Sequence, residues 1–485
     1  MERILKKLDP ERVFYYFEEI TKIPRCSGEE KKISDYLVDF AKKNKLEVIQ
    51  DEALNVIIKK KGTLGYENSP VVVLQGHMDM VGEKNEGADH DFSKDSIEIF
   101  IEGDFIKAKE TTLGADDGIA VAMSLAILES KDIPHPPLEV LITTNEETGM
   151  NGAMSLNPEF IRGRILINLD SEEEGILLVS CAGGERNKVT IPIIWEENKK
   201  EMEGYIIKTE GLLGGHSGAE INKGRGNSNK ILGRILNSIN EKLGINLYRI
   251  SGGAKTNAIP RTAEAGIVVE KGKAGILKKE ISVIEDELKN ELRCTDKNIK
   301  ITLNLDTEEI NKIYSKSTSD NIINFLMLTP NGVKTMSGEI LGLVESSSNI
   351  GIVHSTEKEV IFESSIRSSK KSLQKYISRI TKIAGEVSGG RWESYSSYPA
   401  WEYNPNSYIR DLFKNTYKDI YGKDIKIEAI HAGLECGLFK EKFEDMDMVS
   451  LGPDMVGVHT PEERLSISST KRTWELLTEV LKKIK

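Results

Sequence analysis

Two polar side chains end an apolar run near the start of the chain. The run Val71-Val-Val-Leu-Gln-Gly-His-Met-Asp-Met80 places His77 and Asp79 two positions apart. In an extended strand, side chains at positions i and i+2 lie on the same face, so both are expected to point beyond the strand end. A histidine beside a carboxylate is a candidate metal ligand, because the carboxylate can accept the ring N–H that faces away from the metal. A surface His–Asp pair at a strand end is the alternative.

Further acidic and imidazole groups follow where a strand is expected to end or a helix to begin. They lie in Thr112-Leu-Gly-Ala-Asp-Asp-Gly118, Thr143-Thr-Asn-Glu-Glu-Thr-Gly149, Asn168-Leu-Asp-Ser171 and Gly457-Val-His-Thr-Pro461. Any one acid pair, taken alone, is typical of a helix cap or a solvated loop. Together, His, Asp, Glu, Asp and His are the donors that hold two zinc-type ions about 3.5 to 4 Å apart around a shared carboxylate. The set therefore indicates a dinuclear metal site.

The elements that would position these groups alternate between helices and strands. Asp9-Pro10-Glu11 predicts the start of a first helix, and a second helix is expected over about 29–44. Strands are expected at 55–60, 71–75, 104–109, 138–143 and 164–169, with an apolar helix at 118–130. This alternation predicts an α/β domain with a mostly parallel mixed sheet between helices. Such sheets bind ligands beyond the carboxyl ends of their strands.

The character of the sequence changes near Arg186. Glycine-rich loops such as Gly211-Leu-Leu-Gly-Gly215, charged helices and strands with surface alternation then continue to about Gly390. In the last segment, expected helices and strands again alternate as they do in the first part of the chain. We therefore predict a catalytic domain formed by two parts of the chain, 1–186 and 393–485. An α+β lid domain at 187–392 is inserted between them.

Composition limits the classes of partner and compartment. The 485 residues carry a formal charge of −11 with both signs mixed and no basic stripe, which argues against nucleic acid and anionic membranes. No stretch approaches the ~18 uncharged apolar residues of a membrane span, and the amino terminus lacks a signal sequence. The four cysteines are far apart, which fits reduced thiols. We expect a cytoplasmic protein.

The acidic and imidazole blocks resemble those of a known family. Five of them resemble, in order and context, the metal-binding blocks of the dinuclear zinc peptidases related to carnosinase and aminoacylase: Gly76-His-Met-Asp-Met-Val81, Leu113-Gly-Ala-Asp-Asp-Gly118, Asn145-Glu-Glu-Thr-Gly149, Asn168-Leu-Asp170 and Gly457-Val-His459. The resemblance is strongest to the aminoacyl-histidine dipeptidase (Xaa-His dipeptidase, peptidase D) branch. Four further blocks support it: Gly214-Gly-His-Ser-Gly218, Thr256-Asn-Ala-Ile-Pro260, Ser364-Ser-Ile-Arg-Ser368 and His431-Ala-Gly-Leu-Glu-Cys-Gly437.

This resemblance implies a role for each metal-site residue. It places two Zn²⁺ ions, for which Co²⁺ or Mn²⁺ can substitute, on a set of five ligands: His77 and Asp170 on one ion, Glu147 and His459 on the other, and Asp116 bridging both. Asp79 would orient His77. Glu146 would be the general base, moving a proton from the water between the ions to the leaving amine. Asp117 is expected to cap the following helix and to lie outside the site.

The resemblance also implies substrate contacts outside the metal site. His216 would stabilise the oxyanion, while Asn257 and Arg367 would bind the carbonyl and carboxylate ends of the substrate. His431 and Glu435 would line the pocket, without assigned roles. In some family members the lid histidine acts across a dimer, so a homodimer is an open alternative to a monomer.

The resemblance therefore implies a cytosolic metallodipeptidase for short unblocked peptides, including Xaa-His dipeptides such as carnosine. An N-acyl-amino-acid deacylase would share every metal ligand and differ only in its pocket. A non-catalytic peptide-binding protein of this fold would be expected to lack the base or part of the ligand set. Glu146 and all five proposed ligands are present, which argues against that alternative.

Overall fold

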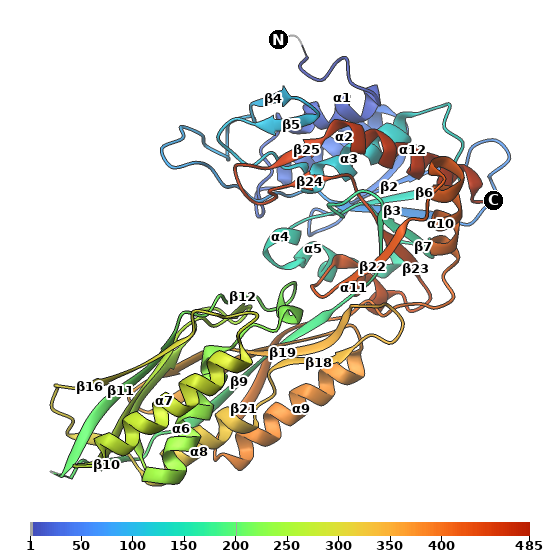
Figure 1. The fold of residues 1–485 in the computed structure, drawn as a ribbon. Helices are drawn as coiled ribbons and strands as arrows, with labels where there is room; N and C mark the ends of the chain where they lie inside the picture. Colours follow the sequence, from blue (N-terminus) through green and yellow to red (C-terminus); the bar gives the residue numbers. More distant parts are fainter. Residues whose placement is uncertain (1–2, 200) are drawn as a thin grey trace. The chain divides into compact units, whose positions relative to one another are not determined.

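The computed structural model describes residues 3–199 and 201–485, and the chain divides into two compact units (Figure 1). The first unit comprises Met1–Ser180, Tyr403–Ala429 and Leu434–Lys485. The second comprises Cys181–Glu402 and Ile430–Gly433 and is inserted in the chain between parts of the first. The domain limits at residues 186 and 392 stay a prediction.

The first unit is built on an eight-stranded mixed sheet. In spatial order its strands are β1 (Glu47–Gln50), β2 (Val56–Lys60), β6 (Leu138–Thr143), β3 (Val72–His77), β7 (Ile165–Asn168), β23 (Asp447–Ser450), β8 (Ile176–Cys181) and β22 (Lys426–Ile430). The four central strands, β6, β3, β7 and β23, pair in parallel, while β1, β2 and β8 join by antiparallel pairing. Every residue of β3, β6 and β7 is buried, as expected for strands covered on both faces.

Helices complete the first unit. They are α1 (Glu11–Ile20), α2 (Lys31–Lys43), α3 (Ala115–Glu129), α10 (Tyr408–Tyr421), α11 (Glu435–Lys442) and α12 (Ile467–Lys483), with three short turns of helix, α4 (Glu146–Gly149), α5 (Asn151–Ser155) and η1 (Pro158–Phe160). Helix α3 is apolar on all sides and packs against α1 and β3, so it is buried from residue 115 to residue 128. A separate sheet holds β24 (Met455–Val456), β25 (Arg464–Ser466), β5 (Phe105–Ala108) and β4 (Ile99–Glu102).

The second unit is an antiparallel sheet with helices along one face (Figure 1). The strand order is β16 (Lys300–Leu305), β11 (Met202–Glu210), β15 (Ala263–Glu270), β13 (Asn246–Gly252), β19 (Val344–Ser355), β20 (Glu359–Ser368), β9 (Gly183–Pro192) and β21 (Arg391–Tyr398), with β18 (Gly332–Met336) paired to β19. The helices are α6 (Ser228–Leu243), α7 (Ala274–Glu291), α8 (Lys316–Leu328) and α9 (Lys371–Val387). Their apolar faces and the inward residues of the sheet form one core.

Two small two-stranded ladders and one 3-10 turn complete the second unit. Strands β10 (Trp195–Glu197) and β17 (Lys312–Tyr314) form one small ladder, and β12 (Gly215–His216) and β14 (Ala258–Ile259) form another. A 3-10 turn, η2 (Ile221–Lys223), follows β12.

The predicted fold class is confirmed: an α/β unit with parallel central strands accompanies an α+β unit. The strand expected at 104–109 is present as β5, and it pairs with β4 and β25 rather than with the main sheet. One boundary differs from the prediction. Helix α3 begins at Ala115, three residues earlier than expected. Within the described part of the chain, no helix is long and apolar enough to span a membrane.

Candidate metal centre

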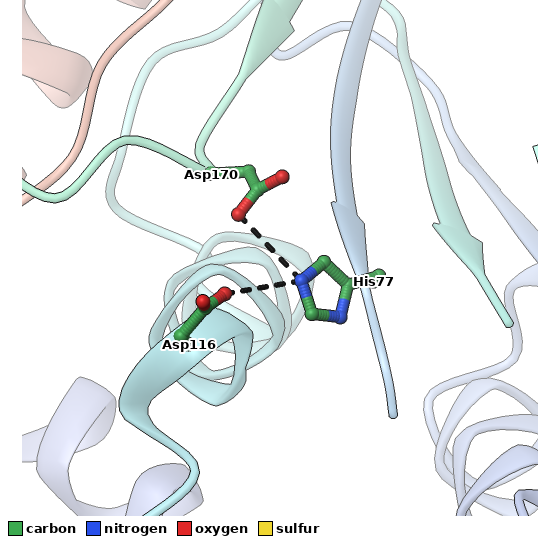
Figure 2. A group of neighbouring side chains, drawn as sticks. All are labelled: His77, Asp116 and Asp170. Carbon is green, nitrogen blue, oxygen red and sulfur yellow. Dashed lines mark hydrogen bonds and ion pairs between the residues drawn. The ribbon is translucent and has the colours of Figure 1, made fainter. Parts of the chain in front are cut away.

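The first group of ligand atoms gathers at the carboxyl ends of parallel strands. His77 is the last residue of β3, and Asp170 follows β7 by two residues. His77 Nε2 lies 3.1 Å from Asp116 Oδ1 and 3.6 Å from Asp170 Oδ1 (Figure 2). Because the ends of parallel strands meet at one edge of the sheet, groups about 90 positions apart in the sequence converge there. One ligand atom from each of these three residues lies within 4.8 Å of the other two.

A second group of ligand atoms shares Asp116 with the first. Asp116 Oδ2 lies 3.1 Å from His459 Nε2, and Glu147 Oε2 lies 2.9 Å from the same nitrogen. The two oxygens of one carboxylate therefore face different imidazoles. This is the arrangement that a bridging carboxylate requires.

Asp79 lies behind His77 and also supports the segment that carries Glu147. Its Oδ1 is 3.4 Å from His77 Nδ1, the ring nitrogen that faces away from Asp116 and Asp170. The same carboxylate accepts the backbone N–H of Glu146 at 3.1 Å and of Glu147 at 3.3 Å. These are the first amides of α4, which need acceptors outside the helix. Asp79 thus connects the β3 end to α4, a link that its spacing from His77 did not reveal.

Glu146 is adjacent to Glu147 in α4 but belongs to neither group of converging ligand atoms. Asn145 and Met150 flank the turn with φ of 56° and 57°, so both adopt the left-handed backbone conformation. Burial, reinforced by the nearby carboxylates of Asp170 and Glu435 and opposed by His77, holds the pKa of Glu146 well above its ordinary value.

The charges of the two groups fit divalent cations. Burial alone would raise the pKa of Asp116, but hydrogen bonds from His459 and His77 outweigh it and lower that pKa. Hydrogen bonds to Asp116 and then Glu147 raise the pKa of His459 to about 11. The imidazoles thus supply protons to carboxylates that would otherwise repel one another. Glu147 Oε1 is buried without a hydrogen-bond partner among the described residues. Two metal ions would provide both the positive charge and the missing partner.

Asp117 does not take the capping role expected for it. Its Oδ2 accepts the backbone N–H of His77 at 3.1 Å, and the residue is buried with non-helical φ and ψ inside α3. The backbone amides that lead into α3 are bound instead by Glu463. Asp117 therefore braces the end of β3.

Two buried charged residues near this centre were not singled out from the sequence. Arg25 and Glu463 are each 2% exposed, and both bind the backbone of the Leu113–Asp116 segment. Glu463 lies only four residues after His459, the one sequence signal that could have drawn attention to it.

Glu435 lies at the start of α11 in the first unit, fully buried beside the sheet. Its Oε2 accepts hydrogen bonds from Thr143 Oγ1 at 2.8 Å and Gln75 Nε2 at 2.5 Å. Gln75 in turn accepts from Asn168 at 2.5 Å. Burial raises the pKa of Glu435 to about 8. The network ties the ends of β3, β6 and β7 together, and a substrate contact for Glu435 stays a prediction.

The other predicted substrate residues lie in the second unit. His216 in β12 pairs with Ala258 in β14, and the Ser217 amide donates to the Asn257 carbonyl at 2.9 Å. The β12 segment with His216 and the Asn257 loop therefore hold each other in place. The Asn349 side chain donates to the carbonyls of Thr256 and Ala258, and these two hydrogen bonds fix the loop that carries Asn257.

His216, Arg367 and His431 are close enough to influence one another electrostatically. Burial and then the charge of Arg367 lower the pKa of His431 to about 3 and also lower that of His216. His431 Nε2 lies 2.7 Å from Ser347 Oγ, and Arg367 donates to Tyr398 Oη at 2.9 Å. Both shifts favour the neutral form of the imidazole, beside one guanidinium.

Gly218 permits the close approach of the two histidine segments. A Cβ at this position would lie 2.6 Å from the His431 carbonyl oxygen and 3.0 Å from His216 Cε1. Any larger residue would push the β12 segment with His216 away from His431. The structure thus brings together His216, Asn257, Arg367 and His431 within one unit.

Comparisons with known proteins agree with this arrangement. The model of Peptidase family M20/M25/M40 matches residues 73–483. The cytosol non-specific dipeptidase of Escherichia coli (strain K12) is 41% identical over 480 residues, which cover 99% of each chain. The crystal structure of aminoacylhistidine dipeptidase from Vibrio alginolyticus superposes with a TM-score of 0.96 at 37% identity, covering 100% of this chain and 99% of that one. Aminopeptidase PepT from Bacillus cereus shares the fold at a TM-score of 0.57 and 17% identity, covering 98% of this chain and 99% of that one.

Proposed function

The chain belongs to peptidase family M20/M25/M40, and from this premise we propose that it is a cytosolic dipeptidase with two Zn²⁺ ions per subunit. Its substrates would be short unblocked peptides, including Xaa-His dipeptides such as carnosine. The observation that carries the proposal is the convergence of two ligand groups on the two oxygens of Asp116. The names of the similar proteins from Escherichia coli and Vibrio alginolyticus support the substrate class.

Each metal ion would have two ligands of its own and share a third. His77 and Asp170 would hold the first ion, Glu147 and His459 the second, and Asp116 would bind both. Asp79 would keep His77 in the tautomer that presents Nε2 to the metal. When bound, the ions would polarise the peptide carbonyl and acidify a water molecule. Co²⁺ or Mn²⁺ would be substitutes.

Glu146 would be the general base. It would accept a proton from the attacking water and deliver it to the nitrogen of the leaving amino acid. The support is positional: α4 carries the proposed ligand Glu147, and Glu146 is next to it without belonging to either ligand group. Asp79 holds the amides of both residues, so base and ligand are fixed by one carboxylate.

The cluster in the second unit would bind the remaining parts of the substrate. His216 Nδ1 accepts the amide N–H of Ala219 at 3.1 Å, so the neutral ring carries its proton on Nε2. That N–H is suited to stabilise an oxyanion. Arg367 would bind the substrate carboxylate and Asn257 a carbonyl, with His431 and Glu435 as further pocket residues.

Purified protein should contain two zinc ions per chain and hydrolyse carnosine or simple dipeptides. Removal of the metal with a chelator should abolish turnover, and added Zn²⁺ should restore it. N-acetyl and N-succinyl amino acids, tested at the same concentrations, provide the matched comparison. Faster hydrolysis of these than of dipeptides would identify a deacylase and reject the proposed substrate class.

Replacing His216 with alanine should lower kcat for dipeptides by about 10²-fold, because one oxyanion donor is lost. KM should change little, since the proposed contact forms mainly in the transition state. His354→Ala, a change to a histidine in β19 of the same unit, is the matched control. An unaltered kcat in the His216 variant would remove this residue from the mechanism.

A further inference from the structure

One short segment both supplies a proposed metal ligand and holds the backbone of another. Gly457–Glu463 carries His459 and, four residues later, the buried Glu463. The turn is closed by the Thr460 amide donating to the Gly457 carbonyl and by the Glu463 amide donating to the Thr460 carbonyl. The positions of the His459 and Glu463 side chains are therefore coupled through a tight turn.

The Glu463 carboxylate accepts four consecutive backbone N–H groups. The donors and distances are Leu113 at 2.7 Å and Gly114 at 2.9 Å to Oε2, and Ala115 at 2.7 Å and Asp116 at 3.3 Å to Oε1. The last of these is the amide of the proposed bridging ligand itself. Because these amides lead into α3 and have no helical acceptor, a buried anion is the group that satisfies them.

Arg25 holds the same loop from its other side. Its guanidinium donates to the carbonyl of Gly114 and to those of Met78 at 2.9 Å and Asp79 at 3.1 Å. Gly114 has φ of 70°, and a Cβ there would lie 2.5 Å from Arg25 Nη2. Arg25 thus joins the end of β3, which presents His77, to the loop that presents Asp116.

A helix end alone would not require this arrangement. An ordinary N-cap satisfies one or two amides with the side chain of the cap residue. Here a carboxylate about 350 residues away in sequence binds four, and the same loop must place each Asp116 oxygen 3.1 Å from a different imidazole. Sub-ångström control of the Asp116 backbone is what a shared ligand needs.

We propose that Glu463 is a positioning residue for the dinuclear centre: its carboxylate fixes the Leu113–Asp116 backbone so that Asp116 can bind both metal ions. The proposal rests on the proposed function, because it takes Asp116 as the bridging ligand. The hydrogen bonds of Glu463 go to backbone amides and not to the side chain of any proposed ligand. Glu463 would not touch substrate. Its effect would be on metal affinity and coordination geometry.

Glu463→Gln preserves the shape of the side chain and removes its charge. One oxygen becomes an amide nitrogen, which must face two backbone donors that it cannot accept from. We expect both metal-binding steps to weaken by about 10- to 100-fold, since loss of an outer contact has effects of this size. Both steps should weaken because Asp116 is common to the two groups.

The experiment compares wild type, Glu463→Gln and Glu462→Gln, the exposed neighbour serving as matched control. Metal-free protein is titrated with Zn²⁺ against a chelating indicator, and thermal unfolding of the metal-free forms is measured in parallel. The visible absorption spectrum of the Co²⁺-loaded forms reports coordination geometry, which a purely structural role would not alter. The expected result is weakened Zn²⁺ binding and a changed Co²⁺ spectrum in Glu463→Gln alone.

Zn²⁺ affinities within threefold of wild type, with an unchanged Co²⁺ spectrum, would overturn the proposal. If Glu463→Gln does not fold, Glu463→Asp replaces it: the charge remains but the shorter side chain cannot reach all four amides, and the same two readouts decide. Wild-type protein that binds two Zn²⁺ ions without cleaving dipeptides would overturn the proposed function while leaving this inference. Dipeptide hydrolysis by the wild type together with a normal Zn²⁺ titration of Glu463→Gln would overturn this inference and leave the proposed function.

Discussion

Replacing Glu146 with alanine will reduce dipeptide hydrolysis by about 10²- to 10⁴-fold, the usual contribution of a general base. Zinc content should remain near two ions per chain, because Glu146 lies outside both ligand groups. The loss should appear in kcat, since proton transfer occurs after substrate binds. Metal analysis and steady-state kinetics on the same preparation measure both quantities.

Glu159→Ala is the control for this variant, because Glu159 is an exposed carboxylate in η1 of the same unit. It should leave both metal content and kcat unaltered. Loss of both zinc ions from Glu146→Ala would show that Glu146 has a ligand role or supports α4, and would reject its assignment as the base. Retained turnover with retained zinc would reject that assignment in a different way.

The fold was predictable from the sequence where local patterns carry the information. Continuous apolar runs that end in polar residues identified β3, β6 and β7. The change to glycine-rich loops and charged helices near residue 186 indicated a second unit. The strand at 104–109 was predicted but its sheet was not, because strand propensity does not report which partner a short edge strand pairs with. Pairing with β25, more than 350 positions later, decides its place.

The candidate site was predictable to a different extent for each kind of residue. The proposed ligands lie where strands end, where helices begin or in a loop, and in blocks that resemble a family, so their types and order drew attention to them. Asp117 was misinterpreted, because a carboxylate at a helix start is usually a cap, whereas here its Oδ2 accepts the backbone N–H of His77. Arg25 and Glu463 went unnoticed since a single sequence does not distinguish a buried charge from a solvated one.

Three carboxylates hold the segments that carry proposed ligands, and each accepts hydrogen bonds from backbone amides. Asp79 holds the amides of α4, Asp117 holds the His77 amide, and Glu463 holds the loop before α3. Backbone amides are stiffer supports than long side chains, because they carry no rotamer freedom of their own. The proposed ligands His77, Glu147 and Asp116 therefore lie on backbone that these carboxylates hold, which limits how far each can relax when the charge at the centre changes.

Asp116 is the residue whose replacement should affect the centre most. Asp116→Asn keeps the shape of the side chain but leaves one oxygen, so only one of the two groups retains its shared ligand, and a negative charge is lost. We expect both zinc ions to bind more weakly by more than the ~10- to 100-fold that follows loss of an outer contact. Hydrolysis should fall at least as far as in Glu146→Ala, because the remaining base has no acidified water to act on.

Asp170→Asn provides the comparison that separates a shared ligand from a private one. Asp170 approaches His77 and belongs only to the first group, so its loss should weaken one binding step and spare the other. Zn²⁺ titration of the metal-free proteins should therefore show two weakened steps for Asp116→Asn and one for Asp170→Asn, with Asp132→Asn, an exposed change, resembling wild type. Two full-affinity sites in Asp116→Asn would mean that the two ligand groups do not share this carboxylate, and the dinuclear assignment would fail.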